Sequence, residues 1–169
     1  YNHWGGNGGY GAILNYNLLD SNLRSGEVGL HAASKGGDGG RWAIQSGGRH
    51  YGDGADGHDA NVVVSGTGIS AGTYGIWVNS QGGEGQEPSI RDVLPSGDSG
   101  RGGNAGNAGL NLSYGSSVNV SGSTGQGETA GVLVQSVGGR GGDGFHGGVG
   151  GGHSTAGQGG DTGDVSVSI

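Results

Sequence analysis

The sequence predicts an all-β fold, a β-solenoid in which short strands stack coil upon coil and long glycine-rich loops extend from the stack. Two observations carry this prediction: one strand-like phrase occurs three times, and glycine-rich stretches separate its copies. The chain has 169 residues, of which 48 are glycine. A single copy cannot bury its apolar face, whereas stacked copies can, as in solenoid proteins. We therefore expect a single domain over residues 1–169.

The repeated phrase reads glycine, apolar, any, apolar or small, any, serine, any, glycine, glycine. It occurs at Gly29–Gly39, at Gly75–Gly85 and within Ala130–Gly144. Successive side chains of a strand face opposite sides, and one of the two alternating sets stays small and apolar in every copy. We expect anchor strands near 29–36, 75–82 and 131–138, stacked in register. The residues expected to face inward are Leu30, Ala32, Ser34, Ile76, Val78, Ser80, Val132, Val134 and Ser136. Those expected to face outward are His31, Ala33, Lys35, Trp77, Asn79, Gln81, Leu133, Gln135 and Val137.

Shorter apolar runs lie between the anchor strands. The spacing of Leu18, Leu19 and Leu23 fits a single helical turn, but the asparagines and the aspartate around them favour short strands joined by turns. Further short strands are expected within Asn61–Ser70, Gly109–Gly122 and Asp164–Ile169.

The glycine-rich stretches offer few side chains to fill a core. Glycine loses the most backbone freedom on folding, so ordered glycine loops must be held by backbone hydrogen bonds to one another. We expect packed polyglycine strands with three residues per turn in these loops. A collagen triple helix is excluded, because glycine does not recur strictly at every third residue and there are only two prolines.

Composition limits the class of protein. Leucine, isoleucine, valine and phenylalanine are scarce, which favours disorder, but they cluster in alternating runs and the net charge is only −7. The seven basic residues are scattered, so no basic patch for nucleic acid is expected. No apolar run is long enough to span a membrane. The chain begins at Tyr1 without a signal-peptide pattern, and we expect a processed product or a segment of a longer protein.

The repeats resemble those of a known family. The phrases V-L-V-Q-S-V-G-G-R-G-G-D-G and G-I-W-V-N-S-Q-G-G-E-G resemble the recurring G-I-x-A-Q-S-I-G-G-rich motif in passenger regions of bacterial autotransporter and adhesin-like surface proteins. The runs V-N-V-S-G-S-T and D-V-S-V-S-I resemble strand–turn segments of that family. The resemblance covers about Gly57–Ile169 well and Tyr1–Gly40 less well. It implies a right-handed parallel β-helix, export, and a structural role outside the cell or at its surface.

Calcium is the cofactor for which the sequence offers a weak candidate site. Gly138–His146 fits one glycine-rich nonapeptide of calcium-binding β-rolls, with Asp143 as the ligand, but the flanking segments do not repeat it in tandem. Asp53, Asp56 and Asp59 lie close together in one glycine-rich stretch and are further calcium candidates. No other cofactor is expected.

An enzyme is not expected. The six histidines show no i,i+4 pair typical of zinc enzymes, and there is no G-x-S-x-G motif. Aromatic residues are frequent for so polar a chain, and Trp77, Trp42 and Tyr74 are candidates for binding glycans or a host surface. The alternative is that these rings cover the thin core and the glycine backbone.

The strand expected at Asp164–Ile169 has no cap after it, so Val165, Val167 and Ile169 are the expected assembly contact. Head-to-tail contact of identical chains does not close and therefore produces a filament. A proline at position 167 is expected to block that contact. The sequence thus predicts an extracellular, self-assembling fibre, stalk or matrix component of a bacterial surface. The alternative function is an adhesin module that binds glycan or a host surface through exposed rings.

Overall fold

The computed structural model describes residues 6–40, 51–87, 98–122, 128–144 and 155–169. These residues form ten β-strands and no helix, which confirms the all-β prediction for the described part of the chain. The strands are β1 (Leu14–Leu19), β2 (Asn22–Arg24), β3 (Val28–Lys35), β4 (Ala60–Ser65), β5 (Gly68–Ala71), β6 (Tyr74–Gln81), β7 (Ala108–Leu112), β8 (Ser117–Val120), β9 (Ala130–Val137) and β10 (Val165–Ser168).

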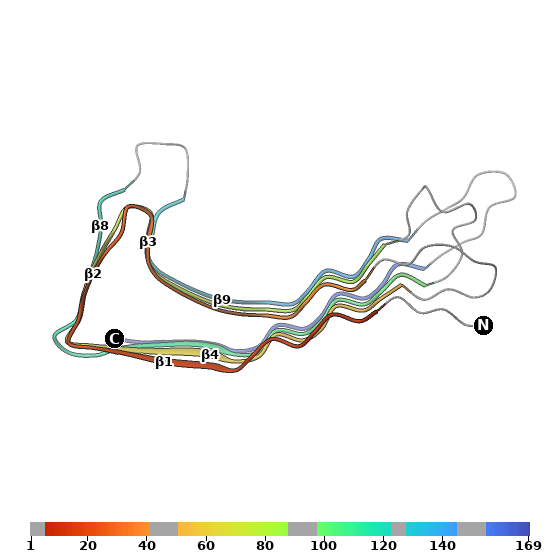
Figure 1. Cartoon of the computed structure of the whole chain (residues 1–169), viewed down its shortest axis with the longest axis horizontal. Coiled ribbons are helices and arrows are strands. Elements are labelled where there is room, and N and C mark those ends of the chain that lie inside the picture. Colours follow the sequence, from red (N-terminus) through yellow and green to blue (C-terminus); the bar gives the residue numbers. More distant parts are fainter. Residues whose placement is uncertain (1–5, 41–50, 88–97, 123–127, 145–154) are drawn as a thin grey trace, which may run out of the picture.

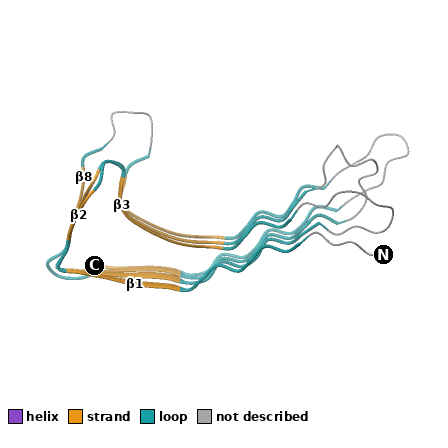
Figure 2. Cartoon of the chain, in the orientation of Figure 1, coloured by secondary structure: helices purple, strands orange, loops and turns teal. Residues whose placement is uncertain are grey.

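All pairings between these strands are parallel, and they build three sheets. The sheets have the orders β1-β4-β7-β10, β2-β5-β8 and β3-β6-β9. Successive coils lie over one another, and the short sheet β2-β5-β8 joins the two longer sheets at one end of the molecule (Figure 1). At the other end the chain leaves the sheets as two layers of glycine-rich loop that run side by side (Figure 2). The predicted stack of parallel strands is therefore present.

The three copies of the repeated phrase form β3, β6 and β9 and pair in the expected register. Leu30 lies beside Ile76 and Ile76 beside Val132, and the three serines of the phrase likewise follow one another across the sheet. The alternation of small apolar side chains sets this register, because a slip of one residue would turn the apolar set away from the core.

The core is a narrow column of aliphatic side chains between the sheets. Ile76 and Val78 are both 0% exposed, as predicted. Val132 and Val134 pack against the same cluster but are only partly buried, because β9 is the last strand of its sheet. The buried apolar residues of this cluster are Leu18, Ala32, Ala60, Val62, Val64, Ile69, Ile76, Val78, Ala108 and Leu110.

Two details differ from what the sequence predicts or leaves open. The alternation places Asn79 on the outward face of β6, yet only 7% of this residue is exposed to solvent. Ala33 and Gln135, its neighbours on the adjacent strands, cover it. The leucines of the first segment lie on β1 and β2, so the single helical turn considered for them does not form.

The corners between sheets need a left-handed backbone at particular positions. Asp20 follows β1 with φ of 44°, and Gly66 follows β4 with φ of 58°. Aspartate and glycine are the residues that enter this region at least cost. A Cβ on Gly66 would lie 2.2 Å from Oδ1 of Asp20, so the two corners stack too closely for a side chain there.

Candidate functional site: the glycine layers and the open strand edges

Within the described ranges, the two glycine layers are built from seven runs of chain. Four inbound runs lead into the sheet that starts with β1, and they comprise residues 6–13, 51–59, 98–107 and 155–164. Three outbound runs leave the sheet that starts with β3, and they comprise residues 36–40, 82–87 and 138–144. One coil is an inbound run, three strands and an outbound run.

Hydrogen bonding in the inbound runs repeats every three residues, which is the period of a polyproline II helix. The triplet Gly100–Gly102 shows the pattern. The N–H of Gly100 donates to the carbonyl oxygen of Gln86, on an outbound run, at 3.0 Å, and the N–H of Arg101 donates to Oδ1 of Asp53, on the preceding inbound run, at 2.7 Å. The N–H of Gly102 donates to the carbonyl oxygen of Gln158, on the next inbound run, at 2.8 Å. The triplet 103–105 repeats the same three destinations. The triplet 106–108 does so for its second and third N–H groups, while its first, that of Gly106, donates to Oγ of Ser80 on β6. Every backbone donor of residues 100–108 therefore has a partner, although these residues have almost no side-chain core.

The two layers are joined by columns of backbone hydrogen bonds that pass alternately between inbound and outbound runs. In each column the N–H of one residue donates to the carbonyl of the one before it, at distances from 2.6 to 3.4 Å. One column contains Gly9, Gly37, Ala55, Gly83, Gly103, Gly139 and Gly160, and the other contains Gly6, Gly40, Gly52, Gln86, Gly100, Gly142 and Gly157.

This hydrogen-bonding pattern brings backbone against backbone, which explains the glycine content. A Cβ on Gly103 would lie 2.1 Å from the carbonyl oxygen of Ala55, and one on Gly82 would lie 1.8 Å from that of Gly103. Ala55 belongs to one of the columns and carries a methyl group, so a position in a column does not by itself require glycine. Glycine is required where a neighbouring carbonyl lies too close for a Cβ.

The serine of the repeated phrase makes hydrogen bonds like those of the columns at the point where each strand ends and the outbound glycine run begins. The Ser80 hydroxyl donates to the carbonyl of His58 at 2.9 Å and accepts from the N–H of Gly106 at 2.8 Å. Ser34 accepts from the N–H of His58, and Ser136 donates to the carbonyl of Gly106. The serine hydroxyl thus takes the place of a backbone group, which gives a chemical reason for serine at this position in all three copies.

Replacing Ser80 with alanine is expected to lower the free energy of unfolding by about 2–4 kcal/mol, since it leaves two polar backbone groups without a partner at a position that is 0% exposed. Urea unfolding followed by circular dichroism measures this. Ser70, which is exposed on β5, is the matched control, and its alanine variant should change stability by less than about 0.5 kcal/mol. Equal stability of the two variants would contradict the role assigned to Ser80.

The calcium candidates Asp53, Asp56 and Asp59 all lie on one inbound run, three residues apart. Each accepts a backbone N–H of the next inbound run through Oδ1, at 2.7, 2.7 and 2.8 Å respectively. Three residues of a polyproline II helix advance about 9 Å, so successive carboxylates do not converge on one ion. Among the described residues no group of three or more histidines and carboxylates is close enough to hold a metal ion.

The fourth calcium candidate, Asp143, lies on the last outbound run and is paired with Arg140. Nη2 of Arg140 donates to Oδ1 of Asp143 at 2.6 Å on the surface of the run. The hydrogen bond and the charge of Asp143 raise the pKa of Arg140 above its usual value. The carboxylate of Asp143 is therefore engaged within its own run.

The candidate binding rings gather on the outer side of the sheet that starts with β3. Trp77 stacks on His31 of the neighbouring strand with ring centroids 4.3 Å apart and lies 5.5 Å from the ring of Tyr74. Leu133 is beside Trp77 on the other neighbouring strand. Sugars stack on an open ring face, whereas Trp77 has neighbours on both adjacent strands, an arrangement typical of cross-strand stabilisation. Trp42 lies outside the described residues.

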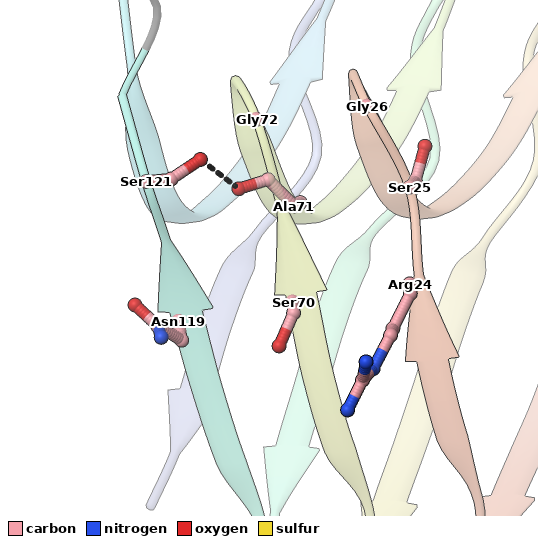
Figure 3. Close-up of a pocket in the computed structure, with 8 residues that line it drawn as sticks. All are labelled: Arg24, Ser25, Gly26, Ser70, Ala71, Gly72, Asn119 and Ser121. Atoms are coloured by element: carbon pink, nitrogen blue, oxygen red, sulfur yellow. Dashed lines mark hydrogen bonds between the residues drawn. The ribbon is translucent and has the colours of Figure 1, made fainter.

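The short sheet β2-β5-β8 carries a shallow depression with a volume of about 470 Å³ on its outer face. Arg24, Ser70 and Asn119 stand beside one another on its three strands and point to the same side, as Figure 3 shows. The row is polar and open, so it offers hydrogen-bonding contacts on the surface of the sheet.

The predicted assembly residues Val165 and Val167 lie on β10, at the edge of the sheet that starts with β1. Tyr16, Val62, Leu110 and Val167 share one register position across the four strands of that sheet. Val62 and Leu110 are 1% and 3% exposed, whereas Tyr16 and Val167, on the two edge strands, are 42% and 50% exposed. Ile169, which follows β10, is 92% exposed. Both edges therefore present apolar side chains of the core type to solvent.

Sequence reasoning missed the role of the middle residue of each triplet. Asn104 and Asn107 accept the N–H groups of Asp161 and Asp164 through Oδ1, each at 2.9 Å. The signal was the spacing of three among Asp53, Asp56 and Asp59, which the sequence offers only as weak candidates for calcium binding.

No protein-family model matches the chain, and no curated protein matches it. Comparison with solved structures finds an antifreeze protein from the springtail Granisotoma rainieri, described as a bundle of nine polyproline type II helices. The two chains are 17% identical, the match covers 98% of each, and the TM-score is 0.23. No conclusion about this chain follows from so low a score. Within the described residues, no helix is long and apolar enough to cross a membrane.

Proposed function

We propose that this chain is an extracellular structural protein whose coils form a right-handed parallel β-helix and whose copies add end to end into a fibre, stalk or matrix component of a bacterial surface. The observation that carries the proposal is the sheet that starts with β1, whose outer strands expose core-type side chains and have a neighbour on only one side among the described residues. An unpaired parallel edge of this kind is a template for another strand.

The glycine layers support a mechanical rather than a chemical role. Their hydrogen bonds link every coil to the next, and the carboxylates of Asp53, Asp56 and Asp59 take part in those links. Asp143 is paired with Arg140, and the ring of Trp77 stacks on that of His31. Catalysis is not part of the proposal. The surface location rests on the resemblance of the repeated phrase to passenger regions of surface proteins.

Assembly is tested by electron microscopy and sedimentation velocity at rising protein concentration. We expect filaments whose fibre diffraction has a meridional spacing of about 4.8 Å, since the strands run across the stack and neighbouring strands are that far apart. A chain that stays monomeric at every concentration, while its circular dichroism shows it to be folded, would refute the proposal.

A further inference from the structure

The glycine runs contain Asp–Gly and Asn–Gly dipeptides, which are prone to a slow rearrangement of the backbone. The glycine nitrogen attacks the side-chain carbonyl carbon of the residue before it, since glycine has no Cβ to hinder the approach. A C–N bond forms, and water leaves from aspartate or ammonia from asparagine. Water then opens the resulting succinimide ring, and opening at the main-chain carbonyl gives isoaspartate, whose backbone is longer by one methylene group. The sequence has five such dipeptides: Asn7–Gly8, Asp38–Gly39, Asp53–Gly54, Asp56–Gly57 and Asp143–Gly144.

In four of these dipeptides a single residue of the next coil holds both reacting groups. Oδ1 of Asp53 accepts the N–H of Arg101 at 2.7 Å, and the N–H of Gly54 donates to the carbonyl oxygen of the same Arg101 at 2.8 Å. We call this pair of hydrogen bonds to one residue the backbone clamp. Asn104 forms the backbone clamp on Asp56–Gly57, at 2.7 and 2.8 Å.

The backbone clamp recurs through the described glycine runs. The same two bonds, at 2.8 to 3.2 Å, hold Asn7–Gly8 and Asp38–Gly39. They also occur where alanine takes the place of the glycine, at Asp59–Ala60, Asn104–Ala105 and Asn107–Ala108. In the remaining Asp–Gly dipeptide, Asp143–Gly144, the carboxylate is bound by Arg140 of its own run. The backbone clamp is therefore a regular product of the stacking of one run on the next.

We propose that Asp53–Gly54 and Asp56–Gly57 are latent isoaspartate sites, which the backbone clamp keeps unreactive while the coils are stacked. Ring closure requires the nitrogen of Gly54 to come within about 3–3.5 Å of the side-chain carbonyl carbon of Asp53, with its peptide plane turned toward that carbon. Turning this plane breaks the hydrogen bond from Gly54 to Arg101. Moving the carboxylate toward the nitrogen breaks the hydrogen bond from Arg101 to Asp53. The reaction therefore waits for the coil to open locally.

This protection preserves the register between neighbouring runs. An isoaspartate at Asp53 would add one methylene group to the backbone of its run and displace the residues after it along the run. The hydrogen bonds between runs repeat every three residues, so the displaced N–H and carbonyl groups would no longer face their partners. The inference goes beyond the proposed function and does not depend on assembly, because it concerns how long a stacked coil keeps its covalent backbone.

The first test compares the unmutated full-length chain in its folded state and in concentrated urea. Isoaspartate at each dipeptide is measured by peptide mass spectrometry after prolonged incubation at neutral pH. One hydrogen bond corresponds to about a tenfold change in rate, so the two bonds of the backbone clamp correspond to a factor of about 100. We expect isoaspartate at Asp53–Gly54 and at Asp56–Gly57 to form more slowly in the folded chain by about that factor. Equal rates in the two states would overturn the proposal.

A backbone substitution separates the clamp from the general rigidity of the fold. Arg101→Pro removes the N–H that Oδ1 of Asp53 accepts and keeps the carbonyl group, and the φ that proline imposes is that of a polyproline II helix. Arg101→Ala also lacks the arginine side chain but retains the N–H, so it is the matched control. Isoaspartate at Asp53–Gly54 should form about tenfold faster in Arg101→Pro than in Arg101→Ala.

The neighbouring dipeptide is the internal reference for both variants. Asp56–Gly57 keeps its two bonds to Asn104, so its rate should be the same in Arg101→Pro and Arg101→Ala. Equal rates at Asp53–Gly54 in the two variants, or an equal rise at Asp56–Gly57 in Arg101→Pro, would show that the clamp is not the cause of the protection. The comparison of folded and unfolded unmutated chain decides the question even if a variant does not fold.

Discussion

Replacing Gly103 with valine is expected to force the two glycine layers apart and to lower the free energy of unfolding by at least about 3 kcal/mol. Gly103 is in the middle of the stack, where its N–H donates to the carbonyl of Gly83 and its own carbonyl accepts from Gly139. The new Cβ would lie 2.1 Å from the carbonyl oxygen of Ala55. Backbone on every side of this position is fixed by hydrogen bonds, so the neighbour cannot move aside without breaking several of them.

Thermal unfolding measures this effect. About 3 kcal/mol corresponds to a melting temperature roughly 6–12 °C lower in a chain of this length. The matched control is Gly159→Val, because the atom nearest to a Cβ on Gly159 is 3.5 Å away, an ordinary contact distance. Neither glycine has a left-handed backbone, so the comparison isolates the close approach of the layers. A control variant as unstable as Gly103→Val would show that the layers do not pack as described here.

The strands could be predicted from the sequence because their information is local. Leu30, Ile76 and Val132 occupy the same place in three copies of one phrase, and a period of two fixes which face they share. Parallel stacking followed from the need of each copy to cover its apolar face. Exposure could not be predicted as well: Asn79 alternates outward as expected, yet its neighbours on both sides cover it.

The order in the glycine runs could be predicted only in outline. Packed polyglycine strands with three residues per turn were expected, but their hydrogen bonds join residues that are distant in sequence. The N–H of Arg101 and the carboxylate of Asp53, for example, are 48 residues apart. The carboxylate oxygen that accepts this distant N–H could equally bind a metal ion. The sequence alone therefore does not distinguish the structural role of Asp53 from that of a metal ligand. The serine of the phrase was expected to face inward, but its two backbone partners lie on a different run and could not be identified.

The sheet that the last strand joins was also beyond the sequence. A strand was expected within Asp164–Ile169, but its pairing with β7 depends on the path of the whole coil. A local pattern therefore located the strand without identifying its neighbour.

A carboxylate in the centre of the core is expected to have the largest effect on stability. Val78 is 0% exposed between Ala32 and Val134, among the apolar side chains of the core. Val78→Asp should lower the free energy of unfolding by about 4 kcal/mol or more at neutral pH, because a buried charge has neither water nor a partner. Burial also raises the pKa of the introduced carboxyl in the folded state above its value of about 3.9 in the unfolded chain. The folded state then binds more protons than the unfolded state between these two pKa values, so stability falls as pH rises through that interval.

Urea unfolding of Val78→Asp and of the unmutated chain at a series of pH values measures this dependence. The difference between the two should be fully developed above the raised pKa and should shrink as the pH falls toward about 3.9, where the carboxyl is protonated in both states. Ser70→Asp, on the exposed face of β5, introduces the same group in water and should show neither the loss nor its recovery in acid. A Val78→Asp variant that matches Ser70→Asp at neutral pH would mean that position 78 does not face the core.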